Sequence, residues 1–205
     1  MKKPGSKGEH KLQKILKTEN SALAFYNTQL INHLNPEMCS FIIQQEFVFI
    51  STSDSNGECD ASFRAGHAGF VEVLDEKTLF FPEYRGNGVL ASMGNISENP
   101  HIGMVFIDFY QSSIGLHVNG KAEIISNEEL KIRPDPSGKI EGALNKSKAR
   151  KPISWIQVQV EEAYIHCSKH IPLMQKKEKT IQWGTDDPKQ KGGDFFNAKN
   201  CDRDP

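Results

Sequence analysis

The sequence is poor in cysteine, and its four cysteines lie far apart, at Cys39, Cys59, Cys167 and Cys201. None forms a Cys-x-x-Cys pair, so the spacing of a structural zinc site is missing and a disulfide framework is not expected. Free thiols are typical of a reducing compartment, and we expect a cytoplasmic protein. The chain also lacks an apolar run of about 18 residues, the length that a membrane-spanning helix needs. Its charged first residues lack the apolar core of a signal peptide, so we expect no membrane partner.

An excess of charge of one sign is missing too. The 205 residues include 25 Lys and Arg against 26 Asp and Glu, which gives a net charge of −1. Electrostatic binding of nucleic acid needs a basic excess, so we expect a small-molecule or protein partner and no nucleic acid. The glycine-rich fingerprints of dinucleotide and nucleoside-triphosphate sites are absent, and we find no internal repeat. The length fits one domain with extensions.

Hydrophobic periodicity predicts helices in the N-terminal part of the chain. Apolar residues between positions 9 and 34 recur at steps of three and four, the spacing of an amphipathic helix. Asn20 or Ser21 offers a cap that would divide this segment into two helices. Pro36 ends the segment and opens a short helix over residues 36–45. We expect these helices to contribute packing and not chemistry.

The middle of the chain reads as a succession of short strands. We predict strands over residues 47–52, 58–64, 70–74, 78–82, 101–109, 114–125 and 153–165, with one helix over 89–97. The tight turns between the first four strands suggest an antiparallel meander, and hence a barrel or a sandwich. The helix within the run of strands would plug one end of a barrel. The prediction is therefore a mainly β fold, a β-barrel with flanking helices.

Two segments break this pattern. Residues 130–152 are rich in Lys, Arg, Pro and Gly and have no aromatic partners, so we predict a mobile, solvated loop in preference to a nucleic-acid-binding arm. The basic residues of this segment are Lys131, Arg133, Lys139, Lys146, Lys148, Arg150 and Lys151. The tail looks loosely ordered, with Trp183, Phe195 and Phe196 as docking points. The predicted units are a helical segment at 1–45, a barrel at 46–172 and an extension at 173–205.

A glycine-flanked basic turn, Tyr84-Arg85-Gly86-Asn87-Gly88, stands between a predicted strand and the predicted helix. It places a cation and an amide just before the helix, where backbone N–H groups and the positive end of the dipole favour an anion. A phosphate would fit such a turn. The alternative is an ordinary strand-to-helix turn that needs glycine for backbone freedom.

Arg64 ends the second predicted strand, and Arg85 follows the fourth. If the strands close into a barrel, the two arginines approach each other at its rim. With Ser62, Asn87 and the helix N–H groups they would form a phosphate clamp, because Arg binds phosphate with two parallel hydrogen bonds and stays charged.

Different roles for these polar residues stay open. Each arginine can instead pair with a nearby carboxylate, such as Asp60 or Glu83. Ser62 has no Gly-x-Ser-x-Gly elbow around it, so a hydrogen-bonding role is expected in place of a nucleophile. The segment His166-Cys167-x-x-His170 has the residue types of a metal site but lacks a second ligand pair, and we expect no metal. No residue stands out as a general base, so the catalytic residues are not predicted.

Four motifs in order carry a family resemblance: GECDASFRAGHAGFVEVLD, TLFFPEYRGNGVLASMGNISENPHIGMVFIDF, GLHVNGKAEI and VEEAYIHCSKHI. Over residues 45–172, with the basic segment outside it, the chain resembles the pyridoxamine 5'-phosphate oxidase-like family of FMN-binding split barrels. The resemblance implies a split β-barrel with antiparallel, Greek-key-like strands, which forms a homodimer. It also implies that FMN lies in the cleft between the subunits, with its phosphate held by basic and hydroxyl groups.

The resemblance also assigns cofactor contacts to named positions. The residues that match them are Ser62, Arg64, Tyr84, Arg85, Asn87, Asn95, Lys169 and Trp183. The segments around Ser62 and Arg85 match phosphate and ribityl contacts, and Asn95 matches a contact near the flavin. Lys169 and Trp183 would approach the cofactor from the partner subunit.

The sequence departs from the true vitamin B6 oxidases at two places. Their Ser-Arg-Lys run is replaced by Arg85-Gly86-Asn87-Gly88, and their C-terminal Arg-x-x-x-Trp-Arg-Leu pattern is absent. The resemblance therefore implies an FMN-dependent oxidoreductase that acts on an unidentified small molecule by hydride transfer. Two further possibilities are a non-catalytic flavin- or haem-binding carrier or sensor, and a deazaflavin-dependent reductase.

Overall fold

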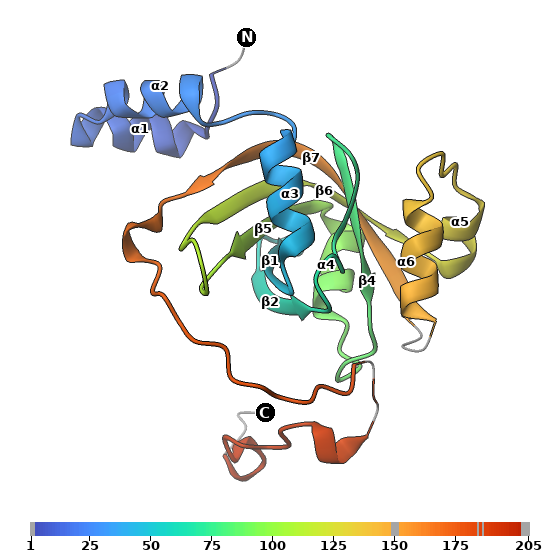
Figure 1. Cartoon of the computed structure of the whole chain (residues 1–205). Helices are drawn as coiled ribbons and strands as arrows, with labels where there is room; N and C mark the ends of the chain where they lie inside the picture. Colours follow the sequence, from blue (N-terminus) through green and yellow to red (C-terminus); the bar gives the residue numbers. More distant parts are fainter. Residues whose placement is uncertain (1–2, 149–151, 184, 186, 202–205) are drawn as a thin grey trace.

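The computed structural model describes residues 3–148, 152–183, 185 and 187–201. Its strands are β1 (Phe47–Ser53), β2 (Cys59–Ala65), β3 (Glu72–Asp75), β4 (Thr78–Glu83), β5 (His101–Ile107), β6 (Gly115–Ile125) and β7 (Ser154–His166). They form one antiparallel seven-stranded sheet in the order β2-β1-β5-β6-β7-β4-β3 (Figure 1). Helices flank this sheet, so the predicted mainly β, split-barrel fold is confirmed, with a sheet that curls without closing.

The strands form because apolar residues alternate along them. In β1, Val48 and Ile50 are buried while Phe49 and Ser51 point outward. The same period of two places one face of each central strand in a common core. That core lies inside the curled sheet, and its fully buried members include Phe81, Met104, Phe106, Val118 and Val158.

The predicted meander of the first four strands is wrong. β1 pairs with β2 and β3 pairs with β4, as hairpins, but β2 and β3 lie at opposite edges of the sheet. The tight-turn argument holds only within each hairpin. Residues 66–71 make a longer connection across the opening of the sheet, and within it Phe70 packs over Gly66, where an added Cβ would lie 2.4 Å from Phe70 Cβ.

The N-terminal segment forms the two helices that the sequence allowed, α1 (Lys7–Leu16) and α2 (Glu19–Thr28). The break falls at Lys17, which adopts a left-handed conformation with φ 56°, and not at Asn20 or Ser21. In Figure 1 the two helices lie beside each other, away from the barrel core. The next helix, α3 (Pro36–Gln44), starts at Pro36 with Asn35 as its cap, and it buries Ile42 in the core.

The prediction of a mobile loop over residues 130–152 is wrong. The segment contains α6 (Lys139–Ser147) and the end of α5 (Asn127–Ile132), which begins with a capping box between Ser126 and Glu129. Leu130, Ile140 and Ala143 are buried against Phe80, Ile125 and Trp155. Arg150 and Lys151 lie outside the described residues.

The basic side chains of this segment misled the prediction because they face outward and find partners. Lys146 pairs with Glu72 at 2.7 Å, and Arg133 pairs with Glu123 at 3.3 Å. Lys139 Nζ donates to the Val73 carbonyl at 2.6 Å. Their charge therefore stabilises the packing of α5 and α6 on the sheet instead of keeping the segment in solvent.

The described part of the tail runs beneath the barrel with short 3-10 turns, at Ser168–His170, Pro188–Gln190 and Ala198–Asn200 (Figure 1). Trp183 contacts the ring of His67 at a centroid distance of 5.6 Å. Phe195 and Phe196 pack edge to face on each other and stay exposed, so their prediction as docking points is wrong. Within the described residues, no helix is long and apolar enough to cross a bilayer.

Candidate ligand-binding site

The candidate site is a polar pocket of about 650 Å³ between β2, the end of β4 and the start of α4 (Ala91–Glu98). It lies at the opening of the curled sheet, where β2 and β4 face each other across the split. A pocket of this volume is large enough for a cofactor or a drug-sized molecule.

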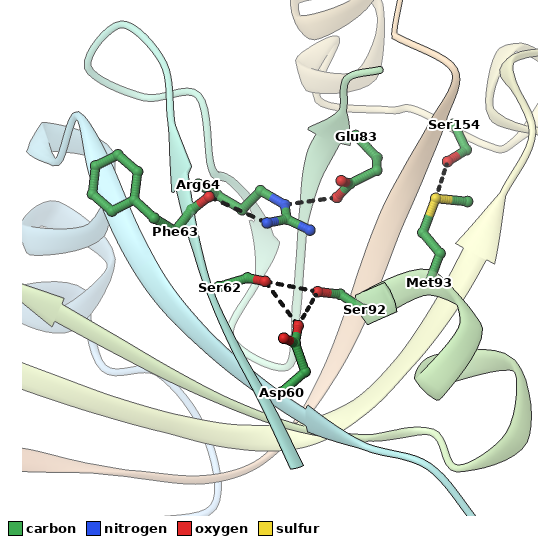
Figure 2. Close-up of polar contacts among 8 residues, drawn as sticks. All are labelled: Asp60, Ser62, Phe63, Arg64, Glu83, Ser92, Met93 and Ser154. Atoms are coloured by element: carbon green, nitrogen blue, oxygen red, sulfur yellow. Dashed lines mark hydrogen bonds and ion pairs between the residues drawn. The ribbon is translucent and has the colours of Figure 1, made fainter. Parts of the chain in front are cut away.

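The inward-facing positions of β2 carry polar residues, whereas other strands carry apolar core residues there. Asp60, Ser62 and Arg64 follow one another at alternate positions, so all three side chains point into the pocket (Figure 2). On the paired strand β1, the inward positions hold Val48 and Ile50 instead. The exchange of apolar for polar residues on a single strand opens the split to ligands.

An ion pair spans the split. Arg64 Nε donates to Glu83 Oε2 at 2.9 Å, and the two side chains are only 21% and 10% exposed (Figure 2). A second nitrogen of the guanidinium donates to the Phe63 carbonyl at 3.2 Å. The structure thus shows Arg64 paired with a carboxylate. This pairing was the alternative to a phosphate clamp in the sequence analysis. The guanidinium carries five N–H donors, so donors remain for a ligand.

Asp60 forms a hydrogen-bonded triangle with two serines on the pocket wall (Figure 2). Its Oδ2 accepts from Ser62 Oγ at 2.9 Å and from Ser92 Oγ at 3.1 Å, and the two hydroxyl oxygens lie 3.1 Å apart. Ser92 is buried in the first turn of α4. The triangle therefore fixes the start of α4 against β2.

The first turn of α4 lacks a side-chain cap. Its N-cap residue, Leu90, adopts a left-handed conformation with φ 58° and makes no capping hydrogen bond. The Asn87 side chain instead accepts from the Val89 N–H at 3.0 Å, which shapes the preceding turn. Arg85 in the same turn is exposed and has no ion pair among the described residues. The N–H groups of α4 and the Arg85 guanidinium thus border the same pocket.

Three aromatic residues line the pocket: Phe63, Tyr84 and Trp183. Tyr84 lies on the wall that this pocket shares with a smaller one of about 180 Å³, which extends toward α6. Trp183 comes from the C-terminal segment of the same chain, whereas we expected it from a partner subunit. Aromatic faces suit the binding of a flat ring system.

Two predicted cofactor residues lie outside the pocket. Asn95 points from α4 toward the sheet and donates to the buried Thr52 Oγ1 at 3.1 Å. Lys169 is exposed in the turn after β7. Six predicted residues, Ser62, Arg64, Tyr84, Arg85, Asn87 and Trp183, do line the pocket together.

Further residues of the pocket, including Glu83, were not predicted as site residues. Asp60 and Ser92 line the pocket, although the sequence reasoning used Asp60 only as a pairing partner for an arginine. The alternation Asp-x-Ser-x-Arg in β2 could have revealed Asp60, because it places all three side chains on one face of a strand. No sequence signal marked Ser92, whose role depends on how α4 packs.

His166, which begins the histidine segment and is the last residue of β7, has a structural role. His166 Nδ1 lies 2.8 Å from His117 Nε2 on the neighbouring strand β6, and His117 stacks on Tyr164. Burial of the ring, followed by the charge of His166, lowers the pKa of His117. Among the described residues, no cluster of three or more His, Cys, Asp and Glu could hold a metal ion.

Solved structures offer distant likenesses. HupZ from Group A Streptococcus has 22% identity and a TM-score of 0.47, over 64% of this chain and 93% of that chain. General Stress Protein 26 from Bacillus anthracis has 19% identity and a TM-score of 0.41, over 63% and 91%. HutZ from Vibrio cholerae, described as a haem storage protein, has 13% identity and a TM-score of 0.42, over 64% and 94%. At these identities, the ligands of those proteins say nothing about this chain.

Comparison with curated protein sequences found no match. A family model described as pyridoxamine 5'-phosphate oxidase matches residues 34–167, which include every strand of the sheet and most residues of the pocket. This match covers well over half of the chain, and the split sheet agrees with it. The chain therefore belongs to the pyridoxamine 5'-phosphate oxidase family.

Proposed function

We propose that the pocket between β2, β4 and α4 binds FMN and that the protein is an FMN-dependent oxidoreductase acting on a small molecule. The observation that carries this proposal is the meeting of two arginines and an uncapped helix N-terminus in one pocket of about 650 Å³. Family membership makes a flavin the cofactor to test first.

The phosphate of FMN would lie at Arg85 and the first turn of α4. The N–H groups of that turn have no side-chain cap, and the dipole of the helix favours an anion there. Arg85 adds a charged donor that forms no ion pair within the described chain. Charged hydrogen bonds of this kind are the strong ones in phosphate recognition.

Two hydrogen bonds to neighbouring residues fix the orientation of the Arg64 guanidinium. Glu83 fixes its Nε, and the Phe63 carbonyl fixes a second nitrogen, so the remaining donors point in a defined direction. A pre-oriented guanidinium loses little conformational entropy when a ligand binds. The ring of the flavin would then lie beside Tyr84 and Trp183, two of the aromatic residues of the pocket.

FMN, when bound, supplies the group that accepts and donates a hydride. The residues of this chain supply placement and charge. Arg85 offsets the negative charge of the cofactor, Arg64 adds the N–H donors that Glu83 leaves unused, and the tail residue Trp183 lines the pocket.

We further propose that the protein is a homodimer, joined through an outer aromatic patch that consists of Phe47, Phe49, Phe63 and Phe109. Their rings contact one another at centroid distances of 5.5 to 6.0 Å, yet Phe49 and Phe63 are 43% and 56% exposed. Exposed aromatic clusters on a sheet face are typical of protein interfaces. Phe63 neighbours Arg64, so a second copy seated here would border the pocket.

The four cysteines support a cytoplasmic location, which we also propose. Cys39, Cys59, Cys167 and Cys201 are all free, as expected in a reducing compartment. Cell fractionation of the tagged protein tests this assignment.

Titration of the purified protein with FMN tests the cofactor. We expect saturable binding that shifts the flavin spectrum, and stopped-flow mixing with NADH or NADPH should then reduce the bound flavin. Absence of FMN binding would contradict the proposal. Binding without turnover with any acceptor would instead favour a flavin carrier. In parallel titrations, a preference for haem would favour a haem-binding carrier or sensor, and a preference for deazaflavin would favour a deazaflavin-dependent reductase.

The variant Arg85→Ala tests the phosphate seat. We expect FMN binding to weaken by about 1.5–3 kcal/mol, because a hydrogen bond from a charged donor is lost. Arg133→Ala is the matched control, since Arg133 pairs with Glu123 outside the pocket. Equal FMN affinity in Arg85→Ala and the wild type would refute this seat.

A further inference from the structure

The described lining of the pocket includes two carboxylates, and they differ in their partners. Glu83 is neutralised by Arg64 at 2.9 Å. Asp60 has no Lys or Arg partner among the described residues, and its hydrogen bonds come only from the hydroxyls of Ser62 and Ser92, both to Oδ2. Its Oδ1 accepts no hydrogen bond within the described chain. A carboxylate that is fixed through Oδ2 and has an acceptor atom left at Oδ1 thus lines a pocket that also holds two arginines.

The free acceptor atom of Asp60 determines which ligand groups can lie beside it. A phosphate or carboxylate oxygen would be repelled, because both partners would be negative and neither would carry a proton to share. A hydroxyl or amine donor would satisfy Oδ1. The ligand must therefore carry its anionic group at the arginines and a hydrogen-bond donor beside Asp60.

We infer that Asp60 recognises a hydroxyl of the ribityl chain of FMN and so acts as a specificity-determining residue of the pocket. This inference rests on the proposed FMN function. FMN combines a phosphate with a chain of hydroxyls, which matches the arrangement of cations and acceptor in the pocket. Haem carries carboxylates at its edge and no hydroxyl donors, so it offers no hydrogen-bond partner to Asp60 Oδ1.

The position of Asp60 agrees with this role. Residues two apart on one face of a strand are separated by about 7 Å, so Asp60, Ser62 and Arg64 form a line along β2 that is about 13 Å long. The guanidinium stands at one end of this line and the carboxylate at the other, with the serine hydroxyl between them (Figure 2). A phosphorylated polyol chain can lie along such a line with a hydroxyl at Asp60 and its charged end toward the two arginines of the pocket.

Binding of three flavins to Asp60→Asn tests the inference. FMN carries phosphate and hydroxyls, riboflavin carries hydroxyls only, and lumiflavin carries neither. We expect Asp60→Asn to raise the Kd of FMN and of riboflavin about tenfold each, the effect of losing a hydrogen bond to a charged acceptor, with lumiflavin unchanged. Asp75→Asn, at the end of β3 and outside the pocket, should change none of the three.

Three results would overturn the inference. Tighter FMN binding with unchanged riboflavin would mean that Asp60 faces the phosphate and competes with it for the first turn of α4. Equal losses for all three flavins would mean that Asp60 only supports the fold. Unchanged FMN and riboflavin binding would mean that it touches no ligand.

Asp60→Ser is the second variant, to be used if Asp60→Asn fails to fold by circular dichroism, and the same expectations apply to it. If the wild type binds FMN and both variants bind it equally well, Asp60 loses its role while the FMN function stands. If the wild type binds no flavin, the FMN function fails, and the role of Asp60 fails with it.

Discussion

Among the glycines of the described chain, Gly120 is the one at which an added Cβ would meet the closest contact. It lies at the bulge where the register of β6 against β7 shifts, and an added Cβ would stand 2.1 Å from the Gln159 carbonyl oxygen. We expect Gly120→Ala to lower the free energy of unfolding by about 2 kcal/mol or more, because the backbone of β7 must move. Urea unfolding of the purified variant measures this loss, and a stability equal to that of the wild type would contradict the close approach.

His117 makes stability depend on pH. The folded state lowers the pKa of this ring through burial and the charge of His166. In the unfolded chain the ring takes up its proton near an ordinary pKa of about 6.5. Because the unfolded state then binds more protons, the contribution of the neutral ring is complete above that pKa and is lost as the pH falls toward the lowered one.

The measurement is the free energy of unfolding at about pH 7.5 and about pH 5.5. We expect a smaller difference between the two values in His117→Gln than in the wild type. His101→Gln, at an exposed position, is the control and should retain the full difference. An unchanged difference in His117→Gln would show that the ring does not resist protonation.

Many individual residues of the pocket could be predicted from the sequence. Ser62, Arg64, Arg85 and Asn87 stand beside strand ends and glycine turns, and their residue types point to an anion. The contact between Arg64 and Glu83 was only one of several possible pairings, because pairing depends on which strands face each other across the sheet. Sequence spacing alone does not contain that information.

Among the elements, α6 departs most from what the sequence indicates. Its lysines and glycines suggest a loop, yet its apolar residues at positions 140, 143 and 144 pack on the sheet. Composition averages over both faces of a helix, so a basic outer face hid the short apolar inner one. The long strands were predicted well because their alternation continues over many residues.

Two glycines test whether α6 is helical in solution. Gly142 lies inside the helix with no atom within 4 Å of an added Cβ, so Gly142→Ala should stabilise the protein by about 0.5–1 kcal/mol. Gly138 precedes the helix with φ 68°, so Gly138→Ala should destabilise it by about 1 kcal/mol. Urea unfolding measures the free energy of unfolding of both variants. If neither substitution changes that free energy, the segment is flexible and not helical.

For the whole molecule, the arrangement of strands was harder to predict than their number and positions. Each hairpin was visible from its turn, but the order of hairpins in the sheet depends on connections such as residues 66–71, which carry no pairing signal. The burial of Phe70 in the core decides the course of that connection, and only the folded chain shows it.

The proposed homodimer can be tested with one exposed side chain. Phe49→Lys places a charge in the outer aromatic patch, away from the pocket lining, and we expect the dimer to dissociate into monomers. Light scattering coupled to gel filtration reads the mass. Phe195→Lys, at a tail residue that is 84% exposed, should leave the mass unchanged. A wild type that is monomeric at all concentrations would refute the dimer.

The order of the strands also fixes when the pocket can form. Its two walls, β2 and β4, are close in sequence, but the sheet connects them only through β1, β5, β6 and β7. β7 is the last strand to leave the ribosome, and apart from the short β3 it is the sole sheet neighbour of β4. A nascent chain that ends before residue 154 therefore holds both arginines and every polar residue of β2, but it has no split for a ligand to enter. Ligand binding can begin only after nearly the whole barrel has been synthesised.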